Sequence, residues 1–181
     1  MFDIRKIQEH IIYESVKDES NEEMASEVVY GKDESGKSED NAIWVNSTMK
    51  RLESKFDKLT VKKIRMKCQC GYGIDEKIEL VKELMKLSSN LEELGNLQKA
   101  IDAGLFYEKG NLYLQFKFCP CPMLADVHKL ESDAWCQCTT GYSKVLFEKA
   151  FQCKVDVELL ESIKMGNKKC LMKIIPQRIK W

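Results

Sequence analysis

The 181-residue sequence has little histidine and no excess of either charge. Two histidines stand against eight cysteines, and 29 basic side chains balance 29 acidic ones. A protein that relies on phosphate contacts usually carries a basic excess, so this balance argues against a nucleic-acid partner. No apolar run approaches the roughly 20 residues of a membrane-spanning helix, so we expect no membrane partner.

An uninterrupted apolar core of the kind found in export signals is also missing near the N-terminus, where charged residues alternate with apolar ones. We therefore expect a cytoplasmic protein. The hydrophobic fraction of 44% and the charged fraction of 32% are typical of a soluble globular chain. Structural disulfides are rare in a reducing compartment, so the cysteines need another explanation.

Six of the eight cysteines form Cys-x-Cys pairs, at Cys68/Cys70, Cys119/Cys121 and Cys136/Cys138. Thiolates are soft ligands, and four of them around one ion form a closed structural zinc site. We predict a metal site at Cys119, Cys121, Cys136 and Cys138, to which Cys68 and Cys70 add ligands or beside which they form a second site. Zinc is the ion we expect, ahead of an iron–sulfur cluster.

The spacing within each pair restricts how both sulfurs can reach one ion. In an extended backbone a single intervening residue sends the two side chains to opposite faces. Convergence therefore requires a turn, which Pro120 and Pro122 favour. Cys138 stands at the start of a predicted helix, where oriented amides lower the pKa of a thiol.

That position of Cys138 also suits two kinds of enzyme, a thiol-dependent small-molecule hydrolase and a thiol oxidoreductase. Cys138 would be the nucleophile, His128 its general base and Tyr142 a donor in a small-molecule pocket. Inert buried cysteines are a further alternative. A winged-helix-like regulator ranks last, because the helices over 74–103 and the hairpin at 108–111 are not accompanied by a basic recognition helix.

The chain is predicted to have three parts. Residues 1–17 have the apolar spacing of a helix, and residues 18–41 form an acidic, glycine-interrupted linker that we expect to be mobile. Residues 42–181 form a single α+β domain that carries the cysteine-lined site. The lysines and arginines over 49–67 are interpreted as a solvated helix face, with a partner-docking patch as the alternative.

Helical periodicity and strand patterns within that domain give its fold class. Helices are predicted over 42–56, 60–69, 74–87, 90–104 and 139–151. Hairpins are predicted from the pair 105–107 and 112–118 and from the pair 155–163 and 168–175. The expected class is α+β, with N-terminal helices followed by antiparallel strands and one inserted helix.

From Cys119 onward the order of motifs is similar to that of a known family. The motifs are Cys119-Pro120-Cys121-Pro122, Trp135-Cys136-Gln137-Cys138, Gly141-Tyr142, Phe147-Glu148, Val155 to Leu159, Ser162-Ile163, Gly166-Asn167 and Cys170. The chain resembles an uncharacterised cysteine-rich family of bacteria and archaea. More distantly, it is similar to L-2-amino-thiazoline-4-carboxylic acid hydrolase-like proteins and to vinyl-reductase-type small-molecule-binding domains. The resemblance implies an α+β domain whose last hairpin packs beside a ligand or metal pocket.

Overall fold

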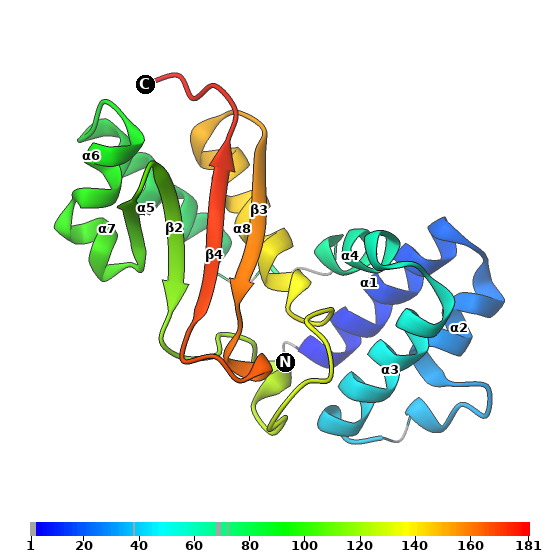
Figure 1. Cartoon of the computed structure of the whole chain (residues 1–181). Helices are drawn as coiled ribbons and strands as arrows, with labels where there is room; N and C mark the ends of the chain where they lie inside the picture. The colour runs from blue at the N-terminus through cyan, green and yellow to red at the C-terminus, as the bar shows by residue number, and fades with distance from the viewer. Residues whose placement is uncertain (1–2, 38, 68–69, 72) are drawn as a thin grey trace. The chain divides into compact units, whose positions relative to one another are not determined.

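Helices make up most of the N-terminal part of the chain in the computed structural model, which describes residues 3–37, 39–67, 70–71 and 73–181 (Figure 1). The chain forms two compact units. The first contains Met1–Cys70, Cys119–Gly141 and Lys164–Gly166, and the second contains Gly71–Phe118, Tyr142–Ile163 and Asn167–Trp181. Residues 42–181, which we expected to form one domain, contribute segments to both units.

Four helices build most of the first unit: α1 (Ile4–Glu19), α2 (Glu22–Tyr30), α3 (Asn41–Lys55) and α4 (Lys58–Lys67). Three of them begin after an acidic or amide residue whose side chain accepts a hydrogen bond from a backbone amide of the first turn, as N-caps do. These caps are Asp3, Asn21 and Asp40. Fully buried apolar side chains from all four helices, such as Ile12, Val28, Trp44 and Ile64, form the interior.

The segment predicted as a mobile acidic linker contains helix α2, and its charges have partners. Lys55 lies 3.0 Å from the carboxylate of Glu27, and Lys63 lies 2.7 Å from that of Glu19. The basic run over 49–67 thus faces the acidic run that precedes it. These ion pairs stabilise the segment modestly. Burial of the apolar side chains of Val28 and Val29 stabilises α2 further, so the segment is folded.

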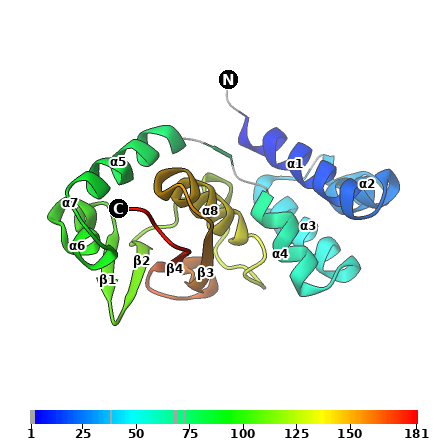
Figure 2. The ribbon, with the colours of Figure 1, turned by 90° about the horizontal axis from the view of Figure 1, so that it is seen from above.

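In the second unit, helices pack on an antiparallel sheet. The helices are α5 (Ile74–Lys86), α6 (Leu91–Asn96), α7 (Gln98–Asp102) and the part of α8 (Gln137–Phe151) from Tyr142 onward. The strands are β1 (Leu105–Glu108), β2 (Asn111–Phe116), β3 (Val155–Glu161) and β4 (Cys170–Pro176). Their spatial order is β1-β2-β4-β3, and α5 and α8 cover the same face of the sheet (Figures 1 and 2).

That covered face holds the core of the second unit. Leu112 and Leu114 of β2 pair with Ile174 and Met172 of β4, and all four side chains are buried. Alternate residues of a strand point to the same side of the sheet, so this register places these four side chains together on the face that the helices cover. Phe118, the last residue of the strand predicted over 112–118, lies beyond the end of β2 and is exposed.

Both predicted hairpins are present, with small differences at their ends. Lys109 and Gly110 both have positive φ angles, the combination required by the two-residue turn between β1 and β2. The helix predicted over 90–104 is divided at Leu97, whose extended backbone separates α6 from α7. The α+β class with N-terminal helices and antiparallel strands is confirmed. Among the residues that the structure describes, no helix has the length and apolar character of a membrane span.

Candidate functional site

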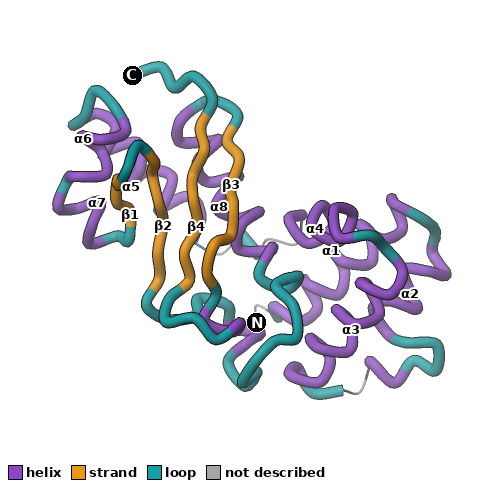
Figure 3. The backbone as a smooth tube through the Cα atoms, in the orientation of Figure 1, coloured by secondary structure: helices purple, strands orange, loops and turns teal. Residues whose placement is uncertain are grey.

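Two described Cys-x-Cys pairs belong to the first unit. Figure 3 shows the long connection between β2 and α8, which is mostly loop. Cys119 and Cys121 are on this connection, Cys136 directly precedes α8, and Cys138 is in its first turn. Cys138 occupies the first turn of that helix, as predicted. Cys70 belongs to the same unit, whereas Cys68 lies outside the described residues. Cys153 and Cys170 are in the second unit.

The sulfur of Cys121 accepts a hydrogen bond from the side chain of Trp135. The indole Nε1 lies 3.4 Å from the Cys121 Sγ, and Trp135 directly precedes the second cysteine pair. Burial raises the pKa of the Cys121 thiol, because a desolvated thiolate is disfavoured. The Trp135 indole and the Met123 backbone amide oppose this rise in pKa, and so does the positive charge of Arg65.

Arg65, on α4, places a positive charge in the interior of the first unit. Its side chain is fully buried, and its guanidinium lies over the Trp135 ring, 4.1 Å from the ring centre. Its Nη2 donates to the backbone oxygen of Trp135 at 3.2 Å. The ion pairs among the described residues do not include Arg65. Burying a cation without a carboxylate partner costs free energy, and a different anionic group nearby would lower that cost.

Gln8, on α1, connects Arg65 to the second cysteine pair. Its Oε1 accepts from Arg65 Nη1 at 3.1 Å, and its Nε2 lies 3.8 Å from the Sγ of Cys138. The side chain is only 2% exposed. Arg65 is thereby joined to Cys138 through Gln8 and to Cys121 through Trp135.

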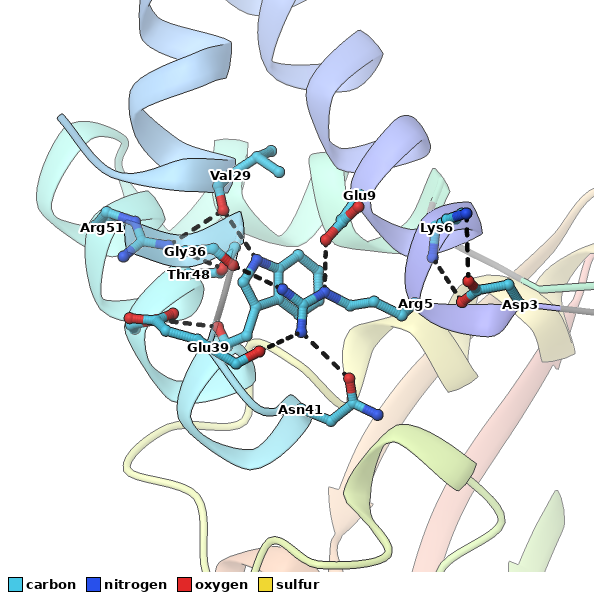
Figure 4. A network of polar contacts seen from close by, with 12 residues as sticks. Asp3, Arg5, Lys6, Glu9, Val29, Gly36, Glu39, Asn41, Thr48 and Arg51 are labelled. Carbon is cyan, nitrogen blue, oxygen red and sulfur yellow. Dashed lines mark hydrogen bonds and ion pairs between the residues drawn. The ribbon is translucent and has the colours of Figure 1, made fainter. Parts of the chain in front are cut away.

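A second arginine and a second tryptophan extend this arrangement toward the surface of the first unit. The rings of Trp44 and Trp135 meet edge to face, with centres 5.7 Å apart. The Arg5 guanidinium lies over Trp44, 4.1 Å from the ring centre. Arg5 also forms an ion pair with Glu9 at 2.6 Å (Figure 4). Figure 4 also shows Arg5 donating to Asn41 and to the backbone oxygens of Gly36 and Glu39. Arg5 has a carboxylate counter-ion in Glu9, whereas the part of the chain that the structure describes offers Arg65 none.

The remaining predicted site residues lie elsewhere. His128 is exposed, and the described residues give its imidazole no hydrogen bond to a cysteine. Tyr142 belongs to the second unit, where Lys77 Nζ lies 4.9 Å from its ring centre. Cys170 is buried, and its sulfur accepts a hydrogen bond from the backbone amide of Ile163.

The described cysteines form no disulfide with one another. Among the described residues there is also no group of three or more His, Cys, Asp or Glu side chains already arranged to hold a metal ion. The two pairs thus share one unit and one buried arginine without forming a preassembled cage.

Sequence reasoning overlooked the two polar residues at the centre of this arrangement, although both leave a signal. Gln8 stands four residues from Ile4 and from Ile12, on the apolar stripe of its helix. Arg65 likewise stands four residues after Val61. A polar residue at a core-facing helix position needs buried hydrogen-bond partners, and Gln8 and Arg65 find them in each other, in the Trp135 carbonyl and in the Cys138 sulfur.

Comparison with known proteins gives a family assignment and no activity. No curated protein and no solved structure matches the chain. One family model matches all of it, residues 1–181, under the description "Family of unknown function (DUF6144)". The chain therefore belongs to the DUF6144 family.

Proposed function

We propose that the first unit binds a thiophilic metal ion, zinc above others, through the thiolates of Cys119, Cys121, Cys136 and Cys138. The observation that carries this proposal is the fully buried guanidinium of Arg65, which has no carboxylate partner among the described residues. Zinc with four thiolates carries a net charge of about −2, and a cation beside it lowers the cost of burying that charge.

The hydrogen bonds around the sulfurs support the same proposal. Trp135 Nε1 and Gln8 Nε2 are N–H donors, so the sulfurs of Cys121 and Cys138 serve as acceptors. A thiolate accepts far better than a thiol, and donors of this kind commonly surround metal-bound sulfur. The raised pKa of Cys121 is compatible with this proposal, because a bound metal ion deprotonates its thiol ligand outright.

Metal binding would then complete the folding of this part of the chain. The described residues hold no preassembled set of ligands, so the ion would draw the two pairs together and fix the loop between them. For Cys70, and for Cys68 outside the described residues, the alternative of a second site beside this one is kept. Four protein ligands leave no open position, so the role we propose for the metal is structural. Such reduced thiols suit the cytoplasm.

Metal analysis of the full-length protein tests the proposal. The protein would be purified without a polyhistidine tag, reduced, loaded with zinc and separated from unbound metal. About one zinc per chain is expected for the wild type and for Cys153→Ser, whose sulfur is in the second unit. Cys121→Ser and Cys138→Ser should each lose most of the metal. Less than about 0.1 zinc per wild-type chain would contradict the proposal.

A thiol-dependent small-molecule hydrolase or oxidoreductase is the second candidate, favoured by the place of Cys138 in the first turn of α8. The distant similarity to L-2-amino-thiazoline-4-carboxylic acid hydrolase-like and vinyl-reductase-type domains belongs to this candidate. It requires an activated Cys138 in the metal-free protein. Rapid alkylation of Cys138 by iodoacetamide at pH 6, against slow alkylation of Cys153, would favour it over a closed metal site.

A further inference from the structure

Gln8 lies between two groups that make opposite demands on its side-chain amide. Arg65 can only donate hydrogen bonds, so the Gln8 atom that faces it at 3.1 Å must be the oxygen. The amide nitrogen is then turned the other way, toward the Cys138 sulfur at 3.8 Å. The buried cation therefore fixes the orientation of an amide that would otherwise be free to flip.

With this orientation, Gln8 offers an N–H group to Cys138. A metal-bound thiolate carries negative charge on its sulfur, and an N–H group directed at that sulfur stabilises the charge. Arg65, Gln8 and Cys138 come from α4, α1 and α8. The relay formed by the Arg65–Gln8 and Gln8–Cys138 hydrogen bonds therefore joins helices that are distant in sequence. The side chain of Gln8 is buried, which shields the contact from water and strengthens it.

We propose that Gln8 is a positioning residue of the metal site, held by Arg65 so that its amide N–H stabilises the metal-bound thiolate of Cys138. This inference rests on the proposed function, and it adds α1 to the elements that determine metal affinity. Partners of metal ligands typically contribute about 10- to 100-fold to affinity. The contribution of Gln8 should fall in that range.

Gln8→Glu separates the two halves of the relay. The variant has nearly the same shape and keeps an oxygen for Arg65, but it presents a carboxylate oxygen where the amide N–H faces Cys138. Two anions would then face each other, so cobalt(II) should bind about 10- to 100-fold more weakly than to the wild type. The new ion pair with Arg65 should leave the stability of the metal-free protein unchanged or increase it. Gln152→Glu, at an exposed position of the second unit, is the control with the same charge change.

Gln8→Met is a neutral second variant that removes both hydrogen bonds. It too should weaken cobalt(II) binding about 10-fold or more. Its sulfur-to-cobalt charge-transfer band should move to longer wavelength, because a thiolate that loses a hydrogen bond gives up its electrons more readily. A residue that only supported the fold would lower stability and leave this band in place.

The outcomes separate this inference from the function on which it rests. If the wild type develops no charge-transfer band with cobalt(II), the metal site itself is wrong, and the role of Gln8 falls with it. If the wild type binds cobalt(II), and Gln8→Glu and Gln8→Met bind it with wild-type affinity and an unmoved band, the positioning role alone is overturned. Weaker binding by both variants, with Gln152→Glu like the wild type, supports it.

Discussion

The guanidinium of Arg65 lies over the ring of Trp135 at 4.1 Å, and both side chains are almost completely buried. A desolvated cation over an indole face gains about 2 kcal/mol or more. That gain is far smaller than the cost of burying an isolated charge, so the ring alone does not account for the arginine. The negative charge of the proposed thiolate cluster would offset the rest of the free-energy cost of burying Arg65.

Replacing Arg65 with methionine should therefore affect metal binding more than folding. The apolar stem still packs on Trp135, while Gln8 Oε1 and the Trp135 carbonyl lose their donor. We expect zinc affinity to fall at least about 10-fold, since the charge beside the thiolates is removed. The free energy of unfolding without metal should fall by no more than about 3 kcal/mol, because the cost of the buried charge disappears too.

Competition with a chelator gives the zinc affinity of this variant, and urea unfolding gives its stability. Arg178→Met, which removes the same charge from an exposed position, is the control and should behave like the wild type. Wild-type zinc affinity in Arg65→Met would mean that the buried charge does not serve the metal site.

Trp135→Phe tests the hydrogen bond to Cys121. Phenylalanine keeps an aromatic ring beside Arg65 and Trp44 but has no N–H group for the sulfur. The free energy of unfolding should fall by about 1–3 kcal/mol through the lost hydrogen bond and the smaller ring. Urea unfolding measures it, with Trp181→Phe, at an exposed tryptophan, as the matched control. Equal stability of the two variants would contradict the packing described for Trp135.

The raised pKa of Cys121 predicts how the stability of the metal-free protein depends on pH. The folded thiol holds its proton more tightly than the unfolded thiol, whose pKa is about 8.5. The contribution of Cys121 to the free energy of unfolding is fully present below the unfolded pKa. It is lost as the pH rises through the higher pKa of the folded protein. The free energy of unfolding should therefore decline above about pH 8.5, and Cys121→Ser, which does not titrate there, should decline less.

Urea unfolding at several pH values, with a chelator and a reducing agent present, measures both declines. Other titrating groups are common to the two proteins, so their difference isolates Cys121. If the free energies of unfolding of the wild type and Cys121→Ser declined in parallel with pH, this thiol would not be desolvated in the folded protein.

Gly141→Ala tests the close approach of α8 to α4 within the first unit. A Cβ atom at position 141 would overlap the backbone carbonyl oxygen of Met66. Since backbone atoms cannot move aside as a flexible side chain can, we expect a loss of about 3 kcal/mol or more. Thr139→Ala, in the same helix turn, should change stability far less. Circular dichroism with thermal unfolding compares them, and a stable Gly141→Ala protein would contradict this helix contact.

The secondary structure was largely predictable because its signals are local. The Asn90 cap, the Lys109-Gly110 turn and the alternating residues of β2 each act within a few positions. Helix α2 was missed because its segment looks acidic and glycine-interrupted, and its stability comes from distant partners such as Lys55. The division into two units was missed for a similar reason. Residues 119–141 join the N-terminal helices and not the strands that precede them.

The sequence by itself determined the α+β class, most of the helix and strand positions, and the cysteine pairs that suggest a metal. The tertiary structure alone decided which residues surround those pairs. Gln8, Arg65 and Trp135 come from three separate segments, and no local pattern relates them. Periodicity tells which face of a helix is buried, but only long-range packing decides which buried polar group meets which partner.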